Sequence, residues 1–330
     1  MKDRLTGGAP GVSIDRLLAG LLALAIAGAI LQITLGGVVR VTGSGLGCPD
    51  WPLCHGRVIP AFDYHTLLEW SHRTTGAAVG LVFIAAMARA WLRHRENRVV
   101  VVSAAAGLGL IVIVGGLGGA VVLTELDPAL RTVHLGLAEL VVLAMVVAYA
   151  AVVMGHGGSR APRGAGTVES SPSQVSLRWL AGGAAAAALI ALLSGSYAVW
   201  RGAGAVCPEW PLCGGSLLPS HELIWIHVAH RLTAVLSTVL ALWTAFRAWR
   251  LDGASTAVRL TAAGAFALAG LQVLAGAANP WTQFEEWARA VHLSLATLVW
   301  TDLTLLTAFL TFRPTALPGA TTQAGRGPAA

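Results

Sequence analysis

The sequence predicts an all-α, polytopic membrane protein with eight transmembrane helices arranged as two tandem, pseudo-symmetric four-helix bundles. Three observations predict this fold class. Of the 330 residues, 55% are hydrophobic and only 12% are charged, and the mean hydropathy is +0.69, whereas about a quarter of the residues of a soluble domain are charged. Eight stretches are long and apolar enough for a helix of about 20 residues to cross a bilayer. The second half of the chain also repeats motifs of the first.

The predicted spans lie near 17–39, 66–92, 99–123, 130–154, 176–199, 222–249, 257–278 and 287–311. The first span is too long for the apolar region of a signal peptide and lacks a small-residue cleavage site, so we expect it to persist as a helix. Lys and Arg gather before the first span, between alternate spans and after the last. By the positive-inside rule both termini are then cytoplasmic, in a multi-pass protein of the plasma membrane. The formal charge of +6 therefore indicates topology and the lipid bilayer as a partner, rather than nucleic-acid binding.

Four regions follow from this pattern. We expect a four-helix first half over residues 1–155, a cytoplasmic Gly-, Ser-, Pro- and Arg-rich linker over 156–176, a four-helix second half over 177–312, and a disordered tail over 313–330. The loop CPDWPLCHG at 48–56 recurs as CPEWPLCGG at 207–215, an offset of 159. Because each repeat has an even number of helices, the two copies face the same way, as in parallel-repeat transporters.

Two His-Arg pairs open the second and sixth spans at an offset of 158, His72-Arg73 and His230-Arg231, and each is followed 62 residues later by another histidine, His134 or His292. A lone histidine in an apolar helix is usually a satisfied polar residue. Four in a repeated pattern indicate function, because ionisable groups inside membranes are costly. Two neutral imidazoles from facing helices, without a neighbouring Cys or Asp cluster, favour axial ligation of a haem iron over tetrahedral zinc. The sequence thus predicts one haem site in each half.

The residues beside these histidines differ between the halves. Glu69 precedes His72 by three residues and shares its helix face, while the second half has His227 at the matching position. A carboxylate beside one reactive centre favours acid–base chemistry in the first half. The alternative is that Glu69 caps or solvates its helix start. His227 competes as a ligand with His230, which the repeat offset favours.

Arg73 and Arg231 each follow a predicted ligand near the membrane interface. A guanidinium there is able to pair with a haem propionate. The alternative is that each side chain extends to the lipid headgroups. Glu139 and Asp302, farther along the fourth and eighth spans, are weaker candidates for proton relay, and packing against a neighbouring helix explains them equally well.

All four cysteines fall on the predicted outer face, where disulfides are stable. The pairs six residues apart are Cys48–Cys54 and Cys207–Cys213. A structural staple is favoured for the second pair. For the first, which lies above the half with Glu69, thiol–disulfide exchange is an equal alternative.

The chain resembles the haem A synthase family over residues 15–312. The resemblance is carried by GLGCPDWPLCHG at 45–56, ExxHR at 69–73, His134, the second CPxWPLC, the second His-Arg and His292. The resemblance implies an oxidoreductase that converts a methyl group of haem O into a formyl group by successive hydroxylations, giving haem A for terminal oxidases. It implies that a farnesyltransferase, haem O synthase, supplies the substrate. An unknown electron acceptor takes the electrons, the terminal oxidase assembly uses the product, and homo-oligomerisation is left open.

The resemblance also assigns roles to residues. His230 and His292 would ligate haem b in the second half. His72 and His134 would ligate haem O or its product haem A in the first half. Glu69 would be the catalytic carboxylate, and Cys48 and Cys54 the loop pair used in turnover. His227 departs from the family pattern, which leaves the ligand choice in the second half less certain than in the first.

Two other functional classes compete with this interpretation. A di-haem membrane electron carrier would account for four histidines, but it has no use for a carboxylate in one half only. A membrane thiol–disulfide oxidoreductase would account for the cysteine pairs, but it does not require four ligand-like histidines.

Overall fold

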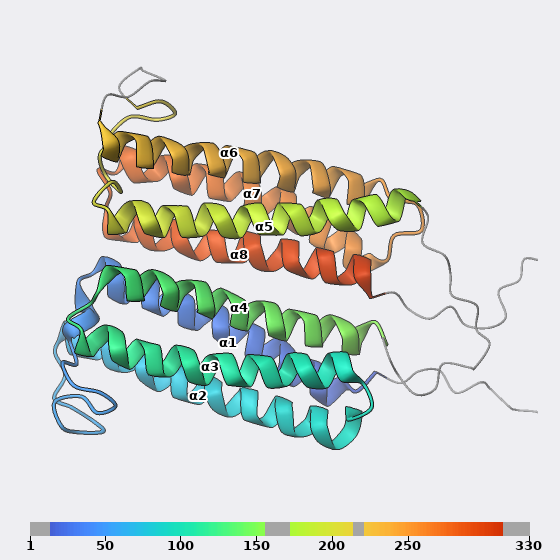
Figure 1. Cartoon of the computed structure of the whole chain (residues 1–330), viewed down its shortest axis with the longest axis horizontal. Coiled ribbons are helices and arrows are strands. Elements are labelled where there is room, and N and C mark those ends of the chain that lie inside the picture. Colours follow the sequence, from blue (N-terminus) through green and yellow to red (C-terminus); the bar gives the residue numbers. More distant parts are fainter. Residues whose placement is uncertain (1–13, 156–171, 214–220, 313–330) are drawn as a thin grey trace, which may run out of the picture.

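The protein folds into eight long helices, each long and apolar enough to cross a bilayer, as the computed structural model of residues 14–155, 172–213 and 221–312 shows (Figure 1). They are α1 (Arg16–Val41), α2 (Tyr64–His94), α3 (Arg98–Leu123), α4 (Pro128–Val153), α5 (Pro172–Trp200), α6 (Glu222–Trp249), α7 (Thr256–Trp281) and α8 (Glu286–Thr311). A short 3₁₀ helix, η1 (Ser44–Leu46), follows α1. The predicted class, a polytopic helical membrane protein, is confirmed.

Most helices begin where a side-chain oxygen accepts a hydrogen bond from a free backbone N–H of the first turn, which stabilises a helix start. The capping residues are Asp15, Asp63, Asn97, Asp127 and Ser255. These caps place the helix starts one or two residues earlier than the hydrophobic pattern alone predicts, because the pattern ignores polar first turns.

The boundary between the halves differs from the predicted one. Helix α5 begins at Pro172, so the last five residues of the predicted linker 156–176 are helical. Proline suits a first helical turn, since the N–H that it lacks has no partner there. Residues 156–171 of that linker, and the predicted tail 313–330, lie outside the described residues.

The helices group into two sets of four. Within α1–α4 and within α5–α8, each helix packs against the two neighbours of its own set, and the sets meet through α1, α4, α5 and α8. Figure 1 shows one set above the other, with both cysteine loops at the left-hand end. We call that end the disulfide end and the opposite one the linker end.

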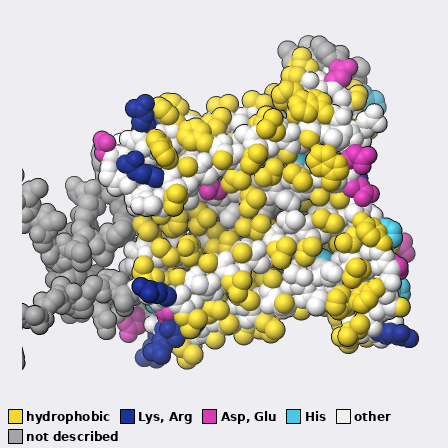
Figure 2. All heavy atoms as spheres, turned by 180° about the vertical axis from the view of Figure 1, so that it is seen from behind, with side chains coloured by type: hydrophobic (Ala, Val, Ile, Leu, Met, Phe, Trp, Pro, Cys, Tyr) yellow, Lys and Arg dark blue, Asp and Glu magenta, His cyan; other side chains and the backbone are white. Residues whose placement is uncertain are grey.

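The outer surface of both sets suits lipid. Large apolar side chains are exposed along the helices, and in Figure 2 they cover the lateral face, while Lys and Arg appear towards its two ends. The interior is made largely of Ala, Val, Leu and Gly, which let helices approach closely in a bilayer. Polar contact is rare between the sets. One such contact is buried: the Thr297 hydroxyl of α8 donates to Glu139 Oε1 of α4 at 2.7 Å.

Candidate functional site

The four predicted ligand histidines lie in the first three turns of α2, α4, α6 and α8, towards the disulfide end. In the second set the rings of His230 and His292 face each other, with centroids 6.5 Å apart and planes at 86°. A metal–imidazole bond is about 2 Å and the ring centre lies about 1 Å beyond the nitrogen, so two imidazoles flanking one metal ion have centres about 6 Å apart. The spacing of His230 and His292 therefore fits a shared metal ion.

In the first set, His72 and His134 lie close enough for an electrostatic interaction between their rings. Their neighbours differ from those of the second pair. The Gln32 amide nitrogen of α1 lies 3.0 Å from His72 Nδ1 and donates to the His72 carbonyl oxygen at 2.8 Å. The structure thus brings these two predicted ligands into one set of helices, held by different groups from those around His230 and His292.

Each histidine ring packs against a glycine of the preceding helix. A Cβ built on that glycine would meet the ring's Cε1 at 3.0 Å for Gly36 and His72, 3.3 Å for Gly118 and His134, 2.8 Å for Gly195 and His230, and 3.3 Å for Gly276 and His292. A larger residue at any of the four would push the imidazole away from the preceding helix. Sequence reasoning missed these glycines as functional, although applying the repeat offset to glycines would have paired Gly36 with Gly195 and Gly118 with Gly276.

The hydrogen bonds of the histidine rings show which ring nitrogen is free to bind a metal ion. The Ser194 hydroxyl donates to the Ala191 carbonyl oxygen at 2.8 Å and lies 3.0 Å from His230 Nδ1. With its proton used there, Ser194 accepts from Nδ1–H, which leaves the His230 Nε2 lone pair free. His134 Nδ1 and His292 Nδ1 are buried without a hydrogen-bond partner.

These donors fit a porphyrin iron. Among the described residues, no three His, Cys, Asp or Glu side chains converge as a metal site would require. Pairs of imidazoles suit an iron whose other four ligands come from the macrocycle. The glycine-backed rings are therefore compatible with a haem in each set.

Glu69 is buried and belongs to a network that reaches the first cysteine loop. Its Oε1 accepts from Arg73 Nε at 2.7 Å, and the remaining Arg73 nitrogens donate to the carbonyl oxygens of Cys48, Asp50 and Leu53 at 2.6–2.8 Å. Helix α2 is capped by the residue before Tyr64, so the alternative role of Glu69 as a cap is excluded. The carboxylate is instead fixed between the loop and the histidine-bearing helix.

The second set has the same arginine contacts without the acid. Arg231 donates to the carbonyl oxygens of Cys207, Glu209 and Pro211 at 2.8–3.3 Å. His227, which replaces Glu69, is buried and donates from Nδ1 to the Ala203 carbonyl oxygen at 2.8 Å.

Arg73 and Arg231 therefore each anchor the cysteine loop of their own half. A guanidinium satisfies its fixed fork of donors most easily with several carbonyl oxygens of one loop. The sequence-based role of these arginines in propionate binding stays a prediction.

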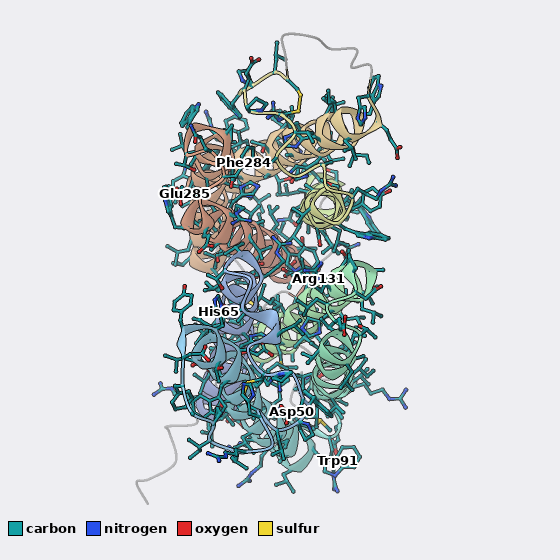
Figure 3. The ribbon with its side chains drawn as sticks, turned by 90° about the vertical axis from the view of Figure 1, so that its left-hand side faces the viewer. Asp50, His65, Trp91, Arg131, Phe284 and Glu285 are labelled. Carbon is teal, nitrogen blue, oxygen red and sulfur yellow. A yellow bond between two sulfur atoms is a disulfide. The ribbon has the colours of Figure 1, made fainter. Side chains whose placement is uncertain are left out.

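Both predicted disulfides, Cys48–Cys54 and Cys207–Cys213, are present. In the first loop the Asp50 carboxylate accepts from the backbone N–H groups of His55 and Gly56 at 2.6 and 2.8 Å. The Gly56 N–H, with a smaller contribution from His55, lowers the pKa of Asp50 below its ordinary value. Trp51 packs on Gly119, next to the glycine that backs His134. The loop thus covers the first histidine pair at the end that faces the viewer in Figure 3, where Asp50 is labelled.

The two weaker candidates lie apart from the histidines. Glu139 is fully buried and bonds Thr297, while its Oε2 has no partner. Asp302 lies against Gly264 of α7, and its Oδ2 has no partner. Glu139 and Asp302 thus each pack against a neighbouring helix. Their role in proton relay stays a prediction.

Comparison with known proteins shows the family to which the chain belongs. A family model described as cytochrome oxidase assembly protein, COX15-CtaA, matches residues 19–65 and 59–304. A protein named heme A synthase from Symbiobacterium thermophilum is 33% identical over 285 residues, covering 84% of this chain and 90% of that protein. A protein of the same name from Alkalihalophilus pseudofirmus is 26% identical, covering 86% of this chain and 94% of that protein. Because the family model matches most of the chain, this protein belongs to the COX15-CtaA family of cytochrome oxidase assembly proteins.

Proposed function

We propose that this protein is a haem A synthase, which oxidises a methyl group of haem O to the formyl group of haem A for terminal oxidases. Family membership supports this activity, as does the name shared by its relatives. The observation that carries the proposal is an asymmetry. Both sets of helices hold a histidine pair, but only the first also holds a buried carboxylate, Glu69, anchored by Arg73. An electron carrier with two equal haems has no need of that difference.

The proposal assigns the two halves different tasks. Residues 1–155 would hold the substrate haem O and the product haem A through His72 and His134. Residues 177–312 would hold haem b through His230 and His292, because His227 there is engaged with a backbone carbonyl oxygen and supplies no acid. When bound, haem b supplies one-electron redox chemistry. The described residues give it two facing imidazoles backed by glycines.

Within the first half, the proposed role of Glu69 is to take up protons. Converting a methyl group to a formyl group with an oxygen atom from water releases four electrons and four protons, and these protons need an acceptor. The Arg73 guanidinium, 2.7 Å from Glu69 Oε1, favours the ionised carboxylate and holds it in one place. An electron acceptor outside the chain must take the electrons, and the Cys48–Cys54 disulfide lies on the same network through Arg73.

The proposal also sets the orientation in the membrane. Disulfides persist in an oxidising compartment, which supports an outward-facing disulfide end. The linker end, with the Arg89–Asp15 ion pair and the basic segments around it, would face the cytoplasm, as would both termini.

The test of this function is the haem composition of cells that depend on this protein for haem A. Cells with Glu69→Gln should contain haem O but no haem A, measured by chromatography of extracted haems, while the purified variant keeps its b-type haem in a pyridine haemochrome spectrum. The same substitution at the exposed Glu222 is the control and should leave haem A unchanged. Normal haem A in the Glu69→Gln cells would refute the role of Glu69, and absence of haem A with the wild-type protein would refute the activity.

A further inference from the structure

Three arginines gather at the disulfide end where the two sets of helices meet. Arg40 lies near the end of α1, and Arg131 and Arg289 lie in the first turns of α4 and α8. The charges of Arg131 and Arg289 both act on Arg40, and Arg289 Nη2 donates across the boundary to the Val41 carbonyl oxygen of α1 at 3.2 Å. Figure 3 shows Arg131 at this end, between the two groups of helices.

These positive charges have no acidic partner in the part of the chain that the structure describes. The ion pairs there join other residues. The acids one turn before Arg131 and Arg289 do not neutralise them, because the Asp127 carboxylate caps α4 and Glu285 is exposed. Arg289 Nε is buried without a partner. Three half-buried cations at one place are costly unless an anion joins them.

The helix register directs two of these arginines at the first histidine pair. Arg40 follows Gly36 by four residues, so it shares the face of α1 on which His72 packs. Arg131 precedes His134 by three residues and shares its face of α4 in the same way. Each guanidinium therefore starts about one helical turn nearer the disulfide end than the rings. A flat ligand held between the His72 and His134 rings would therefore present the edge nearest the disulfide end to the Arg40 and Arg131 guanidiniums.

The cluster is unequal between the two halves. The repeat offset of 159 that pairs Gly36 with Gly195 pairs Arg40 with Val199, which is apolar and 49% exposed. Arg131 and Arg289 occupy equivalent positions of the repeat, each three residues before its histidine, so Arg40 is the charge that the second half lacks. This difference falls in the same half as Glu69, so both additional ionisable groups of the first half lie around His72 and His134.

We propose that Arg40, Arg131 and Arg289 form a carboxylate-binding site that receives the propionates of the porphyrin held in the first half. The inference rests on the proposed function and adds to it the way in which the substrate is oriented. Haem O carries two carboxylates on one edge and a long apolar tail elsewhere. Pairing the carboxylates with three guanidiniums at the disulfide end leaves the tail at the depth of the lipid. Arg73 and Arg231 are already committed to loop carbonyl oxygens.

The test compares haem O with its dimethyl ester, which has the same ring and tail but no carboxylate charge. Both are titrated into the full-length protein in detergent. Arg40→Val, which installs the residue of the second half, and Arg131→Gln should each weaken haem O binding about tenfold or more, the expected cost of losing a charged hydrogen bond. Neither should change the affinity for the ester. Arg93→Gln, an exposed arginine at the linker end, is the matched control and should change neither affinity.

The low-spin spectrum of the second histidine pair reports whether each variant is folded. Equal haem O affinity in wild type and in folded Arg40→Val would overturn the inference while leaving the proposed function intact. A fall in retained phospholipid phosphorus without a change in haem O affinity would assign the cluster to an anionic lipid and overturn it too. Failure of the wild-type protein to bind haem O at all would overturn both the inference and the proposed function.

Discussion

Glu139 and Thr297 occupy the same position in the two repeats, 158 residues apart, and they hydrogen-bond each other at 2.7 Å. Equivalent residues of two copies touch only where the axis that relates the copies passes between them. This bond therefore marks the pseudo-two-fold axis, on the packed faces of α4 and α8. Glu139 lies five residues beyond His134 on α4, and Thr297 lies five residues beyond His292 on α8.

Thr297→Val should destabilise the protein by about 1–3 kcal/mol, because it leaves a buried carboxyl group without its donor. The double variant Glu139→Leu with Thr297→Val removes both polar groups and should be more stable than Thr297→Val alone. Thermal unfolding in detergent measures both effects. Additive losses in the double variant would show that the bond contributes no coupling between the two sets.

Gly195→Ala should displace the His230 ring, because the new Cβ would lie 2.8 Å from its Cε1. We expect loss of most of the b-type haem absorbance per mole of purified protein. Gly270→Ala, on α7 where a Cβ meets no atom within 4 Å, is the control and should retain full absorbance. Full haem content in Gly195→Ala would mean that the glycine contact does not hold the ligand.

His292→Ala should abolish the low-spin b-type spectrum, whereas His134→Ala should leave it in place. The reason is that His292 faces His230 across 6.5 Å, while His134 belongs to the other set of helices. Optical and electron paramagnetic resonance spectra of the purified variants measure this. A b-type signal lost in both variants would contradict separate sites.

Arg73→Gln should increase the rate at which mild reductants reduce the Cys48–Cys54 disulfide several-fold. The rate for Cys207–Cys213 should not change. Arg73 binds three carbonyl oxygens of the first loop, and Arg231 binds three of the second. Arg231→Gln should give the opposite pattern, so each variant is the control for the other. Labelling of freed thiols, followed by peptide mapping, separates the two loops. Equal reduction of both disulfides in either variant would contradict this role.

Acid should release the Asp15 contact at the linker end. Burial opposes ionisation of Asp15, but hydrogen bonds from Arg89, the Leu18 N–H and His94 outweigh it and lower its pKa to about 2. A depressed carboxyl pKa contributes stability above its ordinary value of 3.8, and that stability is lost as the pH falls towards 2. Unfolding temperatures of wild type and Asp15→Asn should therefore differ at pH 6 and converge near pH 2. A constant difference would contradict the assignment.

Much of the architecture could be predicted from the sequence because bilayer thickness fixes helix length and the repeat fixes register. The eight spans and both disulfides follow from those constraints and are confirmed. The repeated histidines predicted that His230 and His292 lie close together, and their ring centroids are 6.5 Å apart, while their role as ligands stays a prediction. Helix ends were less accurate where a polar cap such as Asp63 or an early proline such as Pro172 begins the helix.

The side-chain partners could not be predicted, because a periodic apolar pattern does not show which face of a helix meets which neighbour. The contacts of Arg73 with the cysteine loop were not predicted, while its pairing with a propionate stays a prediction. Gly36 lies inside the predicted first span, but the apolar pattern did not show that α1 presents its bare backbone to His72 there. The arginine cluster around Arg40 joins three helices from both halves, so no local motif contains it.

The bond on the axis has a consequence for the origin of the chain. If a single four-helix ancestor had paired with a copy of itself, identical side chains would have stood opposite each other there, acid against acid or hydroxyl against hydroxyl. Joining both copies in one polypeptide let position 139 and position 297 mutate independently, so that one became an acceptor and the other its donor. Covalent fusion thus permits the two copies to take the different roles proposed for them, which a symmetric dimer forbids.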